Sequence, residues 1–189
     1  MSNETIKPTP DEILRYSDSF RAAQVGAHGR EWYEGKVSPT SPEAKTEAVT
    51  ALASTLHENW RKTRLNDRGE YDPRIKPTRD EVWVEAHGTD QVDIANTAYE
   101  DLPVDWQAEN KAAAEVVVGI LDESNGNLDL SNTEARSQVG QTVHKAWLSR
   151  NEWAKGGELD KPFEELPPEE QAKDIVQVET GLKLFKGEI

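Results

Sequence analysis

Two stretches of this 189-residue chain repeat one pattern: FEELPPEEQAKD at residues 163–174 and YEDLPVDWQAEN at residues 99–110. Each begins with an aromatic residue and two acids, continues with Leu-Pro and, after three more residues, reaches Gln-Ala. Proline at the start of a helix has the required φ and gives up no useful donor. The two stretches therefore predict helices that begin at Pro103 and Pro167, in a chain built by internal duplication.

A second pair of matching motifs precedes these stretches. LHENW at residues 56–60 and VHKAW at residues 143–147 both place an apolar residue and His before Trp, with two variable positions between His and Trp. Residues at i and i+3 share a helix face, so each motif predicts an imidazole beside an indole. Each unit then consists of a helix, a connection and a second helix. Such duplicated units bury their apolar faces against each other.

Capping residues and apolar spacing predict the remaining helices. A Thr-Pro pair begins a helix over residues 9–20, and a Ser-Pro pair at residues 41–42 begins a long amphipathic helix that runs to about residue 65. SNTE at residues 131–134 is a capping box that starts the helix of the second motif. The side chains predicted to be buried are Val49, Leu52, Ala53, Leu56, Trp60, Trp106, Ala113, Val117, Ile120, Leu121, Val139, Val143, Ala146, Trp147, Ala172, Ile175, Val178, Leu182 and Phe185.

Residues 66–98 show no helical period, because Gly, Pro and charged residues are mixed along them. Only EVWVEA at residues 81–86 alternates in the manner of a short strand, which predicts one hairpin or an ordered excursion in this region. The predicted fold is therefore mainly α, with at most one small β-hairpin. It consists of an N-terminal helical segment at residues 1–44 and two tandem helical units at residues 45–125 and 130–189.

Composition limits the partners of the chain. A formal net charge of −14 disfavours direct binding of nucleic acid or anionic lipid, since a nucleic-acid binder needs a basic stripe, and it favours basic protein partners. The absence of cysteine excludes disulfides, thiolate nucleophiles and cysteine-ligated metals. No run approaches the roughly 18 apolar residues of a membrane span, and the chain does not begin with an apolar signal segment. We therefore expect a cytoplasmic protein with no membrane partner.

The second unit, VHKAWLSRNEWAKGGELDKPFEELPPEEQAKD, resembles the RyR domain, the repeat module of ryanodine receptors. It carries His-x-x-Trp, a Gly-containing turn, Pro before the aromatic residue and a closing Asp. The first unit departs from this pattern, with Ala98 where the second has Pro162 and Asn110 where it has Asp174. The resemblance implies small helical units, often paired, found in calcium-release channels and in bacteria and their phages. It also implies non-catalytic sensor or interaction modules, for which nucleotide-derived ligands have been suggested.

The side chains around the two motifs are the candidate ligand contacts. An indole can stack on a planar ligand, and an Arg one turn beyond each motif can meet a phosphate or carboxylate. The alternative is that the histidines and tryptophans belong to the core and the arginines pair with the many acids. A pocket would lie between each His-x-x-Trp face and the following aromatic residue, and we prefer the second unit with Arg150 as anion anchor. The candidate residues are His144, Trp147, Arg150, Trp153, Phe163, His57, Trp60, Arg64 and Tyr99.

No familiar motif of catalysis, metal binding or cofactor binding occurs in the sequence. It has no nucleophile elbow, no phosphate-cradling glycine loop and no His-Glu-x-x-His, so we expect no enzyme, no cofactor and no metal. We expect a non-catalytic ligand-sensing or protein-interaction module of bacterial or phage origin, with a nucleotide-derived or other anionic small molecule as ligand. The alternatives are a structural component and an acidic interaction protein that imitates nucleic acid or inhibits a basic host factor. A sensor needs a concave pocket with an accessible Trp or His, whereas a mimic needs carboxylates on a convex face.

Overall fold

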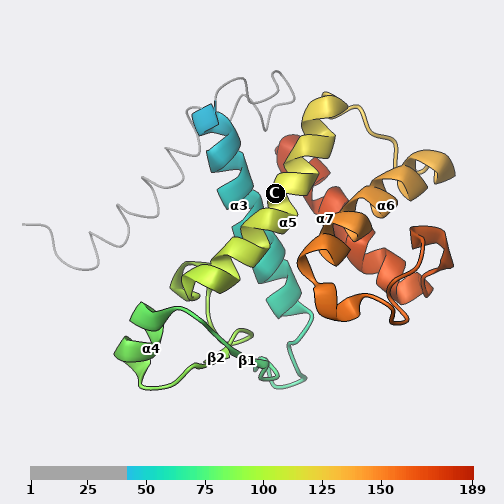
Figure 1. Cartoon of the computed structure of the whole chain (residues 1–189). Helices are drawn as coiled ribbons and strands as arrows, with labels where there is room; N and C mark the ends of the chain where they lie inside the picture. Colours follow the sequence, from blue (N-terminus) through green and yellow to red (C-terminus); the bar gives the residue numbers. More distant parts are fainter. Residues whose placement is uncertain (1–41) are drawn as a thin grey trace, which may run out of the picture.

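Four long helices form the body of the molecule (Figure 1). The computed structural model describes residues 42–189. In this part of the chain the long helices are α3 (Pro42–Lys62), α5 (Val104–Glu123), α6 (Thr133–Arg150) and α7 (Pro168–Phe185). The prediction of a mainly α protein with one small hairpin is confirmed. The helix predicted over residues 9–20 lies outside the described residues.

The insertion of the first unit, between α3 and α5, contains the hairpin and one short helix. Strands β1 (Ile75–Pro77) and β2 (Gln91–Asp93) pair antiparallel, with Lys76 opposite Val92. Helix α4 (Glu81–His87) lies between the two strands in the sequence. Figure 1 shows this excursion at one end of the α3–α5 pair.

The prediction of a strand at EVWVEA is wrong, because these residues belong to helix α4. The side chain of Asp80 accepts hydrogen bonds from the backbone N–H groups of Val82 and Trp83, which begins a helix. Gly88 ends the helix with φ of 69°, a left-handed conformation that glycine adopts without steric cost. No residue of α4 is buried, so the alternation does not mark a sheet face that packs on the core.

The repeated stretch encodes the same local structure twice. Short 3₁₀ helices, η2 (Tyr99–Asp101) and η4 (Phe163–Glu165), precede Leu-Pro and the helices α5 and α7. In the first unit, Gln107 Nε2 donates to the carbonyls of Glu100 and Leu102 at 3.2 and 3.0 Å. In the second unit, the Nε2 of Gln171 donates to the two equivalent carbonyls, Glu164 and Leu166, at 3.3 and 2.9 Å. The Gln of each stretch therefore holds the turn that introduces its helix.

The predicted starts and ends of the helices need small corrections. Helix α3 ends at Lys62, residues 63 and 64 form a turn, and Leu65 forms an isolated β-bridge with Tyr71. Helix α6 is capped by Asn132, whose side chain accepts from Ala135 N–H at 3.0 Å, and not by the preceding serine. The hydroxyl of Ser131 instead donates to Asp129 in the loop before the helix.

One hydrophobic core contains side chains from all four long helices. Helix α7 lies close to α5, since a Cβ at Gly181 would come within 2.5 Å of Val117 Cγ1. Earlier in α7, Asp174 is buried, whereas Ala172, which was predicted to be buried, is exposed. The residues at the centre of the core are Leu52, Ala53, Ala114, Val117, Leu121, Ile175 and Val178.

The buried face of α5 also differs from the prediction. Ala114 and Val118 are buried together with Val117 and Leu121, whereas the predicted Ala113, Ile120 and Trp106 are half-buried. Leu56 and Trp60 of α3 and Ala146 and Trp147 of α6 are half-buried as well. These half-buried side chains matter because several of them line clefts at the surface. Within residues 42–189 no helix is long and apolar enough to cross a membrane.

Candidate functional site

The histidine of each motif ties its unit together. His57 Nε2 lies 3.0 Å from the carbonyl oxygen of Thr97, and His144 Nε2 lies 2.8 Å from that of Leu159. Both imidazoles are buried. Because a carbonyl oxygen only accepts, each Nε2 carries the hydrogen. The two histidines therefore anchor the connection of their own unit to its first helix.

Each imidazole stacks on the indole of its motif, as the spacing predicts. The ring centroids are 5.8 Å apart for His57 and Trp60 and 6.0 Å apart for His144 and Trp147. The tryptophans are half-buried, so one side of each indole remains available at the surface.

The aromatic residue that opens each repeated stretch lies in the core and does not cover a pocket. Phe163 is buried against Gly140, where a Cβ would come within 2.4 Å of the Phe163 Cζ atom. Tyr99 is buried beside His57, and burial raises the pKa of its phenol. Neither ring lines the clefts that follow, which corrects the predicted position of the site.

A cleft of about 400 Å³ lies between the two units, and we call it the inter-unit cleft. Three indoles line it: Trp60 from α3, Trp106 from α5 and Trp147 from α6. The other lining residues are His57, Arg74, Lys76, Ile94, Leu102, Glu109, Asn110, Ala113 and Arg150. The two units therefore contribute to one surface site.

The charge of the inter-unit cleft is opposite to that of the chain. The sequence has 36 acidic and 22 basic residues, yet three cations and only one carboxylate, Glu109, line the cleft. Arg74 and Lys76 come from the insertion of the first unit, at strand β1. Their side chains make no hydrogen bond or ion pair with the part of the chain that the structure describes. They are thus available to an anion that enters the cleft.

Arg150 is the third cation of the inter-unit cleft. Its Nη1 donates to the carbonyl of Ala146 at 2.8 Å, which fixes the guanidinium beside α6. Its Nε is buried and lies 3.8 Å from a carboxylate oxygen of Glu109, too far for a hydrogen bond. A buried donor without a partner costs about 1–3 kcal/mol. The side chain is 22% exposed, so a ligand in the cleft could reach part of the guanidinium.

Two predicted contacts lie elsewhere. Arg64 donates from Nε to the carbonyl of Asp72 at 2.9 Å and lies over Trp60, with 5.8 Å from its Cζ to the ring centroid. Trp153 is 75% exposed and meets Trp147 edge to face at 5.7 Å. Neither residue lines the inter-unit cleft.

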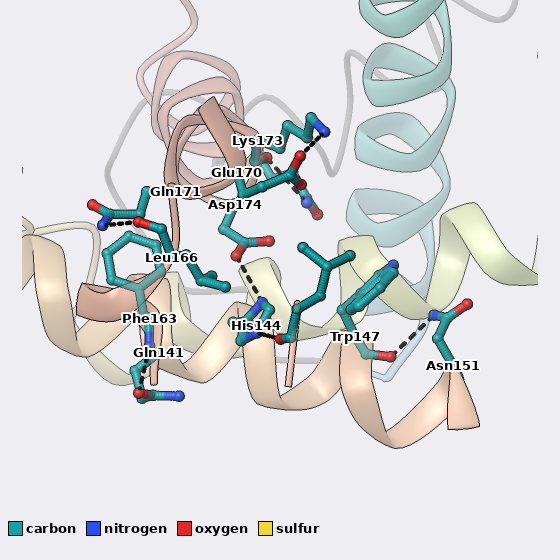
Figure 2. Close-up of polar contacts among 12 residues, drawn as sticks. Gln141, His144, Trp147, Asn151, Phe163, Leu166, Glu170, Gln171, Lys173 and Asp174 are labelled. Atoms are coloured by element: carbon teal, nitrogen blue, oxygen red, sulfur yellow. Dashed lines mark hydrogen bonds and ion pairs between the residues drawn. The ribbon is translucent and has the colours of Figure 1, made fainter. Parts of the chain in front are cut away.

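A second cleft, of about 310 Å³, lies within the second unit, and we call it the second-unit cleft. Figure 2 shows Asp174 reaching down from α7 to His144 on α6, with Trp147 one turn further along α6. The Asp174 Oδ2 atom lies 3.2 Å from His144 Nδ1. Burial raises the pKa of Asp174 to about 6, and the neighbouring His144 acts in the opposite direction. The cleft is lined by His144, Trp147, Trp153, Leu159, Glu170, Lys173, Asp174 and Gln177.

The first unit has no equivalent of this pair. Asn110 stands where the second unit has Asp174, and its side chain donates to the carbonyl of Trp106 at 2.9 Å. Burial lowers the pKa of His57, which keeps this imidazole neutral. This difference between the two units follows from the last position of the repeated stretch, which is Asn110 in the first unit and Asp174 in the second.

A larger groove of about 660 Å³ lies between α3, α5 and α7. It shares Trp60 with the inter-unit cleft, and Leu56, Ala113 and Val176 make much of its wall apolar. Its one cation, Lys173, forms an ion pair with Glu170 at 2.6 Å. This groove therefore lacks the unpaired positive charge of the inter-unit cleft.

The predicted ligand contacts therefore divide into three groups. His57, Trp60, Trp147 and Arg150 meet in the inter-unit cleft, and His144, Trp147 and Trp153 line the second-unit cleft. Arg64, Tyr99 and Phe163 line neither cleft. Sequence reasoning missed Arg74, Lys76 and Trp106, although Trp106 lies inside the repeated stretch where the second unit has Glu170.

Comparisons of the chain with family models, with curated proteins and with solved structures gave no match in any of the three. Within residues 42–189, no group of three or more His, Asp or Glu side chains is placed to hold a metal ion.

Proposed function

We propose that this chain is a non-catalytic ligand-sensing module whose inter-unit cleft binds a planar, anionic small molecule of the nucleotide class. The observation that carries the proposal is the meeting of three indoles with three cations in one cleft of a strongly acidic protein. Indoles stack on planar rings at about 1–3 kcal/mol for each base. Arg74, Lys76 and Arg150 would neutralise the phosphate or carboxylate of the same ligand.

The size and composition of the cleft suit a small molecule. Its volume of about 400 Å³ falls within the range of small-molecule sites, roughly 300–1,000 Å³. Its walls come from both units, so a bound ligand would contact both. The resemblance of the second unit to RyR domains, which implies sensor modules for nucleotide-derived ligands, supports the same assignment.

The proposal is one of binding without catalysis. A general base needs a free lone pair within reach of the substrate. His57 and His144 both use Nε2 for a backbone carbonyl, and His144 Nδ1 faces a carboxylate. His144, which does not line the inter-unit cleft, is therefore not placed to take a proton from a molecule in it.

A thermal-shift titration of the full chain tests the proposal. The probes are adenosine and guanosine monophosphates, their 3′,5′-cyclic forms and the uncharged nucleosides. A ligand that binds only the folded state at 100 times its Kd stabilises it by about 2.7 kcal/mol. We expect a saturable rise in Tm with at least one phosphate-bearing probe and a smaller rise with its nucleoside. The proposal fails if no probe shifts the midpoint.

Charge-removing variants locate the site. Arg74→Gln combined with Lys76→Gln is expected to weaken phosphate-probe binding roughly tenfold or more, since a hydrogen bond to a charged group is worth about 1.5–3 kcal/mol. Trp147→Ala removes one stacking face and is expected to weaken all the probes. The matched control is Arg68→Gln, an exposed cation outside the cleft. Equal losses in the cleft variant and in the control would place the binding elsewhere.

The net charge of −14 favours one competing function, an acidic interaction protein for a basic partner. Such a partner would bind through exposed carboxylates, and its affinity would fall steeply with salt. Removing Arg74 and Lys76 would then leave capture of the partner unchanged or make it stronger. The half-buried indoles of the inter-unit cleft favour the ligand module, because a nucleic-acid mimic has no need of them.

A further inference from the structure

Three hydrogen-bonding groups meet in the second-unit cleft. His144 comes from α6, Asp174 from α7 and the Leu159 carbonyl from the loop at residues 151–162. The imidazole lies between the carbonyl oxygen, 2.8 Å from Nε2, and the carboxylate, 3.2 Å from Nδ1 (Figure 2). All three groups are held inside the fold, since both side chains are buried.

This arrangement requires one more proton than a neutral imidazole and a carboxylate hold together. Leu159 O only accepts, so Nε2 carries a hydrogen. A bare Nδ1 would then direct its lone pair at an ionised carboxylate, and no hydrogen would lie between the two acceptors. Either Nδ1 or the carboxyl of Asp174 must therefore be protonated. One added proton on the His144–Asp174 pair meets this requirement.

We propose that His144 and Asp174 form a proton-binding site that ties the loop at residues 151–162 to α6, and that loss of the proton to solvent releases this loop. After the loss, one N–H remains for two acceptors. The buried carboxylate is the stronger acceptor, because charge-assisted hydrogen bonds are roughly twice as strong as neutral ones. The imidazole then carries its hydrogen on Nδ1, and bare Nε2 faces Leu159 O. The hydrogen bond that ties Leu159 of the loop to α6 is lost.

Few charged groups surround the His144–Asp174 pair. Helix α7 contributes Glu170 and Lys173, which pair with each other at 2.6 Å, and the only titratable residue that α6 contributes to the lining is His144 itself. The loop contributes Trp153 and Leu159, which are neutral, and neither α3 nor α5 contributes a charged residue to this cleft. Glu170 favours retention of the proton and Lys173 opposes it.

The pH range follows from the burial of the carboxyl group. Burial raises the pKa of Asp174 to about 6, above the usual value of a free carboxyl. A raised folded-state pKa means that the folded form binds the proton more tightly than the unfolded chain. The stabilisation is therefore complete only below the usual pKa of the unfolded carboxyl and is lost as the pH rises through about 6. The transition belongs to the pair and not to either residue alone.

The first unit is an internal reference without this proton site. His57 makes the same bond to its connection, at Thr97, but Asn110 replaces the carboxylate. The charged groups that act on His57 are Glu58, Arg61 and Glu100, and burial outweighs them and lowers its pKa. His57 therefore stays neutral with its hydrogen on Nε2. Its connection remains tied at a pH that releases the loop of the second unit.

Proton and nitrogen NMR of the ¹⁵N-histidine-labelled full chain tests the inference without any ligand, so its outcome is independent of the proposed function. Between pH 5 and pH 8, His144 is expected to change from a form with both ring nitrogens protonated, or with the proton on Asp174, to the Nδ1–H tautomer. His57 is expected to remain the Nε2–H tautomer. The inference is overturned if His144 is still the Nε2–H tautomer at pH 8.

Hydrogen exchange checks the release of the loop. After correction for the intrinsic pH dependence, amides of residues 155–161 are expected to lose protection between pH 5 and pH 8. Amides of residues 94–98, in the connection tied by His57, are expected to keep theirs. Equal behaviour of the two segments would contradict the proposal.

Substitution of Asp174 tests whether its carboxyl group is needed for the change in tautomer. In Asp174→Asn, the amide N–H can donate to Nδ1, so His144 keeps its Nε2 hydrogen and its bond to Leu159 at every pH. The variant is expected to abolish the change in tautomer and in loop protection. Glu170→Gln is the control on the same helix, and we expect it to keep the transition with a lower midpoint. If Asp174→Asn does not fold, the comparison of His144 with His57 in the unmodified chain still decides the question.

Discussion

Single residues explain how the two units came to differ. Gly140 stands four residues before His144, and Ala53 holds the equivalent place before His57. The missing side chain at Gly140 makes room for the ring of Phe163. The sequence motifs alone did not show this contact, because Gly140 and Phe163 meet only when α6 packs on the turn that precedes α7.

Gly140→Ala is expected to destabilise the fold. The new Cβ would come within 2.4 Å of Phe163 Cζ, and overpacking of this kind costs about 1–3 kcal/mol. Gly119→Ala on α5 is the matched control, since nothing lies within 4 Å of its Cβ position and alanine favours a helix by about 0.5–1 kcal/mol. Urea unfolding should therefore shift in opposite directions in the two variants. A stabilised Gly140→Ala would show that Phe163 does not pack here.

At the scale of elements, local sequence signals decided most helices and failed in one place. Proline and the repeated stretch marked the starts of α5 and α7 because a proline near a helix start acts through local geometry. The alternation of residues 81–86 predicted the wrong structure, because a period in so short a run is weaker than a capping residue. The cap at Asp80 favours a helix. The role of Gln in the repeated stretch cannot be predicted from the sequence, because its hydrogen bonds to two carbonyls form only in the folded turn.

Gln171→Ala tests whether this glutamine holds the turn before α7. The change removes two side-chain hydrogen bonds, to the carbonyls of Glu164 and Leu166, and is expected to cost about 1–3 kcal/mol of unfolding free energy. Gln107→Ala should cost a similar amount, because its bonds are the same. Gln138→Ala, on the exposed side of α6, is the control and should change stability by less than about 0.5 kcal/mol. Chemical denaturation of the three variants measures the difference.

At the scale of the molecule, the two units share one core and one cleft. Leu52 of α3 and Leu121 of α5 belong to the same buried cluster as Val178 of α7. The insertion of the first unit brings Arg74 and Lys76 to the cleft opposite Arg150 of the second. The insertion, which made the first unit look divergent, is thus what gives the cleft two of its three cations.

A shared core predicts that the described part of the molecule unfolds in a single step. Circular dichroism and tryptophan fluorescence are expected to give coincident urea transitions, as in two-state domains. Gly181→Val would separate α7 from α5, because its side chain would meet Val117 and Leu121, and it should lower the midpoint seen by both probes. Two separate transitions in the unmodified chain would mean that the units are stable independently.

The sequence by itself determined several local features of this protein: a mainly α fold, helices that begin beside the prolines, a repeated stretch before two of them and a His stacked on a Trp in each unit. These features depend on neighbours within a few residues, so they can be found in the chain without its fold. Only the tertiary structure decided which candidates meet. It moved Tyr99 and Phe163 into the core, put Trp60, Trp147 and Arg150 in one cleft and brought Asp174 to His144. Such contacts join residues that are distant in sequence. They depend on the angle at which the helices pack and not on the spacing of residues along any one helix.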